Sequence, residues 1–64
     1  MSANNRLIIY KENLIWKIKN IDVDGAGGYL VMDEYQSLED AIRAADEYMV
    51  DEEVEYGYRI ILPK

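Results

Sequence analysis

Two residue types that furnish most active and metal sites are missing from this chain of 64 residues, which contains no cysteine and no histidine. Without cysteine, disulfide bonds and thiolate metal sites are excluded. Without histidine, the commonest general base and the commonest zinc ligand are absent as well. Threonine is also missing, so Ser2 and Ser37 are the only aliphatic hydroxyl nucleophiles. The composition therefore predicts a binding protein that is not an enzyme and that uses no cofactor.

Long hydrophobic segments are absent too. No run approaches the roughly 18 apolar residues that a membrane-spanning helix needs. Residues 1–6 contain no apolar signal core and no cleavage-site pattern. We therefore expect a cytoplasmic protein with no membrane partner.

The short length limits the core. One domain over residues 1–64 is expected, and a chain of this size buries only about 60% of the surface that its unfolded form exposes. Half of the residues are hydrophobic, at 50%, which suffices for a packed core. Small domains without disulfides or metals depend on good packing or on self-association, so a homodimer is a possible partner arrangement.

Negative charge is concentrated in one part of the chain. The net charge is −6, and residues 22–55 contain twelve of the thirteen acidic residues but only one basic residue, Arg43. Proteins that bind nucleic acid through its phosphates show the opposite bias. Direct binding of nucleic acid by this acidic segment is therefore not expected.

The hydrophobic pattern predicts an α+β fold in the order β-β-β-α-β, with a small antiparallel sheet of three to four strands and one helix packed on one face. Strands are expected at residues 7–10, 14–21, 29–33 and 56–62. In the second strand, Leu14, Trp16 and Ile18 are expected to share a face. Glu12–Asn13 before it forms either a tight hairpin turn or a bulge within one long bent strand. Short connections between the first three strands favour an antiparallel meander.

A helix is expected to begin after Ser37. The Ser37 hydroxyl can accept hydrogen bonds from amides of the first turn, and Asp40 follows at capping-box spacing. An apolar stripe at helical spacing predicts the buried side. This stripe consists of Leu38, Ala41, Ile42, Ala45 and Met49.

Two loop motifs between residues 22 and 28 resemble ligand sites only in part. Asp22 and Asp24 are spaced as in a calcium loop, but Ala26 stands where an oxygen ligand is required and Asp33 stands where a bidentate glutamate is expected. The glycines at 25, 27 and 28 resemble a phosphate-binding loop, yet a strand rather than a helix follows and no lysine is present. A plain hairpin turn is the favoured interpretation of both.

The acidic helix and the turn after it are the best candidates for a functional surface. Carboxylates on a rigid helix can occupy a basic groove built for nucleic acid, and the opposite charges accelerate association. We expect Tyr48 to act as an aromatic anchor beside these acids. The candidate partner-binding residues are Asp40, Asp46, Glu47, Tyr48, Asp51, Glu52 and Glu53.

In its small size, acidity and lack of catalytic residues, the chain is similar in kind to phage-encoded inhibitors of host defence, including anti-CRISPR and nuclease inhibitors. No diagnostic motif carries this resemblance. It implies a basic, nucleic-acid-binding protein as the partner and, for a viral protein, the host cytoplasm as the location.

Two other hypotheses remain open. The first is a structural or assembly module that dimerises through its sheet, for which Ile8, Ile15 and Ile61 would be the sensitive positions. The second makes Arg6, Lys17 and Lys19 a contact for nucleic acid, which the overall charge opposes. In the first of these, the acidic residues only keep the protein in solution.

Overall fold

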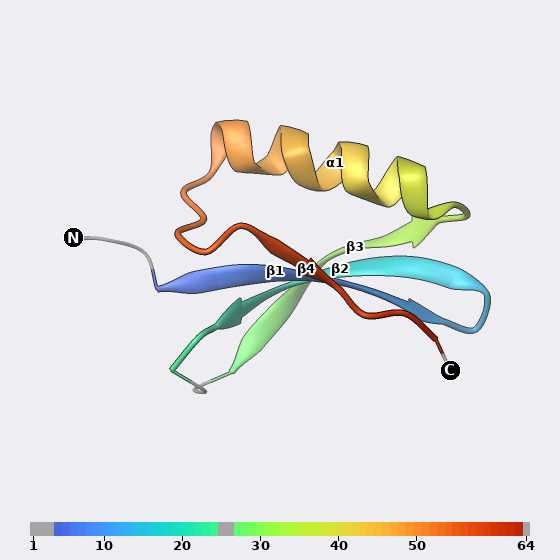
Figure 1. Ribbon diagram of the computed structural model, residues 1–64, viewed down its shortest axis with the longest axis horizontal. Coiled ribbons are helices and arrows are strands. Elements are labelled where there is room, and N and C mark those ends of the chain that lie inside the picture. The colour runs from blue at the N-terminus through green and yellow to red at the C-terminus, as the bar shows by residue number, and fades with distance from the viewer. Residues whose placement is uncertain (1–3, 25–26, 64) are drawn as a thin grey trace.

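Four strands and one helix make up the fold (Figure 1). The computed structural model describes residues 4–24 and 27–63. The elements are β1 (Asn5–Glu12), β2 (Ile15–Asp22), β3 (Gly28–Tyr35), α1 (Leu38–Asp51) and β4 (Tyr58–Ile60). The strands form one sheet in the order β3-β2-β1-β4, and α1 lies across one face of it. The expected α+β fold is confirmed.

The turn between β1 and β2 differs by one residue from the expectation. Asn13 and Leu14 both have left-handed backbone angles, with φ of 54° and 68°. Two such residues in succession match the turn that suits the twist of a two-residue hairpin. Leu14 therefore lies in the turn and is 79% exposed, instead of sharing the buried face with Trp16 and Ile18.

The last strand makes the sheet mixed. β1, β2 and β3 form the expected antiparallel meander, whereas β4 pairs with β1 in parallel. Since β3 and β1 point the same way, α1 is a crossover connection that returns the chain to the far edge of the sheet. A helix that runs back across the sheet leaves the next strand parallel to the one before it.

The core lies between α1 and the sheet. Leu7 and Ile9 on β1 and Ile18 on β2 are fully buried, as strand alternation requires for one face of a sheet. Trp16 joins them from β2. The helix contributes Ala41 and Ala45, whose small side chains let it approach closely.

The helix begins as the sequence predicts. The backbone N–H of Asp40 donates a hydrogen bond of 3.2 Å to the Ser37 hydroxyl, which satisfies one of the free amides at the helix start. No helix in the described part of the chain is long and apolar enough to cross a membrane.

Candidate functional site

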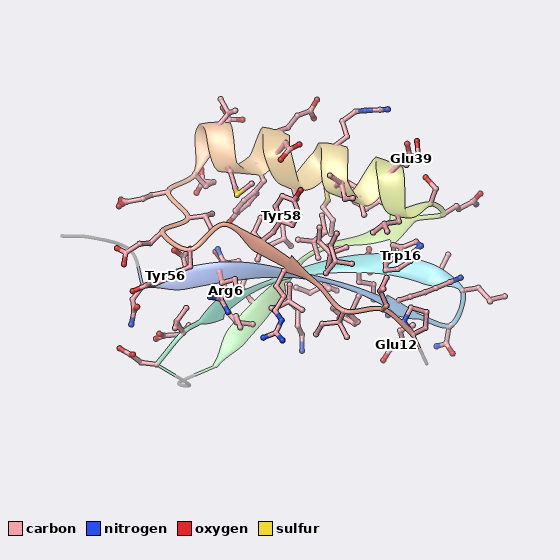
Figure 2. The ribbon with its side chains drawn as sticks, viewed as in Figure 1. Arg6, Glu12, Trp16, Glu39, Tyr56 and Tyr58 are labelled. Atoms are coloured by element: carbon pink, nitrogen blue, oxygen red, sulfur yellow. The ribbon has the colours of Figure 1, made fainter. Side chains whose placement is uncertain are left out.

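The acidic candidates from the sequence lie together on one outer surface of the molecule, on α1 and the turn after it. We call this the acidic helix surface. All six carboxylate side chains are exposed. In Figure 2, Glu39 marks the helix, and Arg6 and Glu12 lie beyond the sheet on the opposite side. The acidic helix surface comprises Asp40, Asp46, Glu47, Asp51, Glu52 and Glu53.

The helical repeat divides the acids of α1 between two flanks. At 3.6 residues per turn, Asp40, Glu47 and Asp51 fall on one stripe, which we call the groove flank. Glu39 and Asp46 fall on the other side of the buried stripe, and we call this the far flank. Residues of the groove flank border hollows that Tyr35 of β3 also lines, so this flank faces the β3 edge of the sheet.

Little positive charge balances the acidic helix surface. Among its four acids on α1, only Asp40 forms a salt bridge within the described residues, with Arg43 at 3.6 Å and both side chains largely exposed. Such a pair contributes at most about 1 kcal/mol. Asp46, Glu47 and Asp51 form no salt bridge with any described residue. Their charges are therefore available to a partner.

Tyr48 is turned toward the interior. Its hydroxyl accepts a hydrogen bond of 3.1 Å from the side-chain amide of Asn20 and lies 3.3 Å from the Tyr29 hydroxyl. The contact with Tyr29, together with burial, raises the pKa of Tyr48. Tyr48 is half-buried against the core, so its ring can offer a partner one face at most and its hydroxyl is already engaged.

A groove separates the groove flank from β3. Its volume is about 350 Å³. Val31, Met32 and Tyr35 of β3 form one wall, and the floor includes Ile18. The helix side is formed by Ala44 and Tyr48, with the carboxylates of Glu47, Asp51 and Glu52 at the rim. An apolar groove with an acidic rim suits a ligand that is both apolar and basic.

The sequence predicted the acidic residues at the rim of this groove but not the apolar residues of β3 and α1 that form its walls. Glu47, Asp51 and Glu52 were predicted from their charge. Val31 and Tyr35 carried no signal beyond strand alternation, and they become part of a site only because the sheet brings them beside α1. Ala44 had no signal of its own except its place next to the buried stripe.

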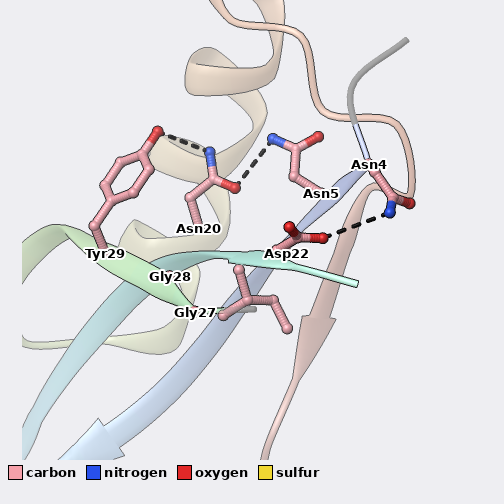
Figure 3. Close-up of a pocket in the computed structure, with 8 residues that line it drawn as sticks. Asn4, Asn5, Asn20, Asp22, Gly27, Gly28 and Tyr29 are labelled. Carbon is pink, nitrogen blue, oxygen red and sulfur yellow. Dashed lines mark hydrogen bonds between the residues drawn. The ribbon is translucent and has the colours of Figure 1, made fainter. Parts of the chain in front are cut away.

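A second hollow, about 380 Å³ in volume, lies where β1, β2 and β3 meet (Figure 3). At its centre, the buried Asn20 accepts a hydrogen bond of 3.0 Å from the Asn5 amide and donates one of 3.1 Å to the Tyr29 hydroxyl. Asn5 also donates to the backbone oxygen of Glu53 at 3.1 Å. No buried side-chain nitrogen or oxygen in the described residues lacks a partner. The network therefore links β1, β2, β3 and the turn after α1, and it leaves no buried polar atom unpaired for a ligand.

The described residues of the loop between β2 and β3, which lies beside this hollow, stabilise the local structure. The backbone N–H of Asp24 donates to the Asp22 carboxylate at 3.0 Å, and the Asn4 amide donates to Asp24. A side chain at Gly28 would lie 2.8 Å from the Asn20 backbone oxygen, so close approach of β2 and β3 requires glycine there. Among the described residues, no cluster of three or more acidic side chains is placed to hold a metal ion. Residues 25–26 of both loop motifs lie outside them.

The face of the sheet opposite α1 is basic and partly apolar. Strand alternation places Arg6, Lys17 and Lys19 there with Ile8, and Arg59 pairs with Ile8 across the β1–β4 register. Lys17 donates a hydrogen bond of 2.7 Å to Glu12. This bond lowers the pKa of Glu12 and raises the pKa of Lys17. The fold thus separates charge, with a basic sheet face and an acidic helix surface.

Comparison with protein-family models, with curated proteins and with solved structures finds no match to this chain, so a functional assignment depends on the geometry described above.

Proposed function

We propose that this chain is a non-catalytic binding protein whose acidic helix surface occupies a basic, nucleic-acid-binding site on another protein. The observation that carries this proposal is the row of exposed carboxylates on one rigid helix, of which only Asp40 forms a salt bridge within the described residues. A partner that neutralises Asp46, Glu47 and Asp51 gains attraction without first breaking a salt bridge to any described residue. Occupancy of such a site would inhibit the partner by excluding its nucleic acid.

Separation of charge supports the same proposal. A surface of one sign raises the rate of association with an oppositely charged site, and the effect decreases with salt. The basic sheet face lies on the other side of the molecule, and it would therefore orient the protein with α1 toward a basic partner. This orientation favours the acidic helix surface over the sheet as the contact.

The experiment starts with capture of partners from host lysate at about 50 and 300 mM salt, over which range screening changes strongly. A captured protein is purified, and its affinity for the wild-type chain is measured by titration. Nucleic acid is then added to test whether it competes for the same site. Asp46→Asn with Asp51→Asn should weaken binding by about 5- to 30-fold, the effect of losing roughly 1–2 kcal/mol from two charge pairs.

Leu14→Lys with Val23→Lys is the matched control. It raises the net charge by the same two units at exposed turn positions away from the helix. Binding should stay within about twofold of wild type. Equal weakening by both variants, or a partner that nucleic acid does not displace, would contradict the proposal.

A second candidate function follows from the uncovered face of the sheet. No described element lies over this face, where Leu30 and Ile61 are 45% and 49% exposed and Ile8 and Ile15 are half-buried. A homodimer would cover these side chains but would bring Lys19 and Arg59 of two copies close together. Sedimentation of wild type and of Ile61→Glu tests this candidate, which requires a dimer that the substitution dissociates.

A further inference from the structure

We propose that the groove between α1 and β3 binds an extended peptide segment with alternating apolar and basic side chains, which adds to the sheet as a strand beside β3. This inference rests on the proposed function and names the part of the basic partner that the protein recognises. It is carried by three features that meet at one place: a free strand edge, an apolar groove and an acidic rim.

The free edge belongs to β3. This strand is the first in the sheet order and pairs only with β2 among the described residues. Its eight residues present an edge of about 27 Å at 3.4 Å per residue. The opposite edge is β4, which has only three residues. β3 is therefore the edge at which a peptide can form a useful number of backbone hydrogen bonds.

The groove lies beside this edge. Val31 and Tyr35 are half-buried on the core side and leave their outer surfaces in the groove wall. The helix opposite them carries Ala44, whose short side chain leaves the groove open. Alternate side chains of an added strand point to the same face, so one row of the peptide's side chains would enter the groove.

The rim selects for positive charge. Glu47, Asp51 and Glu52 are exposed at the groove, and Glu34 lies on β3 itself. The negative potential is felt by the Tyr35 hydroxyl, whose pKa is raised by burial and then by the charges of Glu34 and Glu47. A basic side chain at the rim would relieve this repulsion.

The same charges exclude a second copy of this chain as the occupant. Pairing of two β3 edges would bring Asp33, Glu34 and the rim acids of both copies together, and like charges facing each other across strands are destabilising. A basic strand from a partner overcomes the charge barrier that blocks self-association.

The probe for the test is a fluorescein-labelled peptide of about ten residues in which valine and lysine alternate, long enough to span the β3 edge. We expect it to bind wild type, to slow hydrogen exchange of amides in residues 28–35, and to lose affinity at least about tenfold when glutamate replaces lysine. Methylation of alternate backbone nitrogens on the pairing edge should reduce affinity by about tenfold or more, because it removes the donors for strand addition.

Two charge-matched variants locate the site. Glu47→Gln with Asp51→Asn neutralises the rim, and Glu39→Gln with Leu14→Lys raises the net charge by the same two units at exposed positions outside the groove. Affinity for the peptide should fall by about 5- to 30-fold in the first and stay within about twofold in the second. Ala44→Leu, which fills the groove, should also abolish binding, whereas Ala44→Ser should not.

The outcomes separate this inference from the function on which it rests. Equal weakening by both double variants, or equal binding of the methylated peptide, overturns the groove while the acidic helix surface still serves the proposed function. If the peptide fails to bind but a captured basic protein binds tightly, the groove proposal is likewise overturned and the proposed function is retained. If neither the peptide nor any basic protein binds, the proposed function fails as well.

Discussion

The buried amide of Asn20 connects three strands and the helix, and its replacement by alanine tests how much this network stabilises the fold. Asn20 is 6% exposed. It donates hydrogen bonds of 3.1 Å to the hydroxyls of Tyr29 and Tyr48 and accepts one of 3.0 Å from Asn5. Asn20→Ala removes all three bonds and leaves their partners to find others.

The size of the effect follows from those partners. Each hydrogen bond is worth about 1 kcal/mol net, and more where a buried group is left unsatisfied. The two tyrosine hydroxyls remain 3.3 Å apart and can bond to each other, while the Asn5 amide keeps the backbone oxygen of Glu53. We therefore expect a loss of about 2 kcal/mol in the free energy of unfolding, rather than about 3.

Such a loss is large for a domain of this size. At about 0.05–0.15 kcal/mol per residue, the whole chain is stable by roughly 3–10 kcal/mol. A loss of about 2 kcal/mol should lower Tm by about 8–16 °C. Urea unfolding followed by the fluorescence of Trp16, the only tryptophan and 7% exposed, measures the change directly.

A double-mutant cycle with Tyr48→Phe identifies the cause. If the hydrogen bond between the two residues matters, the cycle should give a coupling energy of about 0.5–1.5 kcal/mol. Asn13→Gly is the control, since Asn13 is exposed and has a left-handed φ of 54° that glycine tolerates, and it should change stability by less than about 0.5 kcal/mol. An Asn20→Ala effect below about 0.5 kcal/mol, or no coupling, would refute the reasoning.

Three further predictions concern the sheet. Gly28→Ala should destabilise the fold by about 1–3 kcal/mol, because the new Cβ would lie 2.8 Å from the Asn20 backbone oxygen; an unchanged urea midpoint would contradict this. Leu14→Gly should raise the urea midpoint by the equivalent of about 1 kcal/mol, since a leucine at φ 68° is strained; a lower midpoint would argue against that strain. Because the hydrogen bond from Lys17 lowers the pKa of Glu12 below its usual 4.5, the stability from this pair is complete above that pH and is lost as pH falls through the folded-state pKa. The difference in urea midpoint between wild type and Lys17→Met should therefore shrink with acidification, and a constant difference would count against the pair.

The sequence by itself determined the features that depend on near neighbours. The helix begins directly after Ser37 because the hydroxyl of this residue accepts a hydrogen bond from the amide three residues later, and the stripe containing Ala41 and Ala45 predicts which side is buried. The exposure of the acids along α1 follows from the same periodicity. The use of these acids for binding a basic partner remains a proposal, as do the cytoplasmic location and the homodimer.

Only the tertiary structure decided the features that depend on residues far apart in the chain. Leu14 has a strand-like pattern, but the pairing of Glu12 with Ile15 places it in the turn. β4 is parallel to β1 because α1 crosses the sheet, which no local pattern records. The groove exists because β3 and α1 pack side by side and leave a gap over Ala44, and the turn of Tyr48 toward Asn20 depends on a contact between residues 28 positions apart. Residue spacing encodes contacts within one element, whereas the space between elements is set by how their surfaces pack.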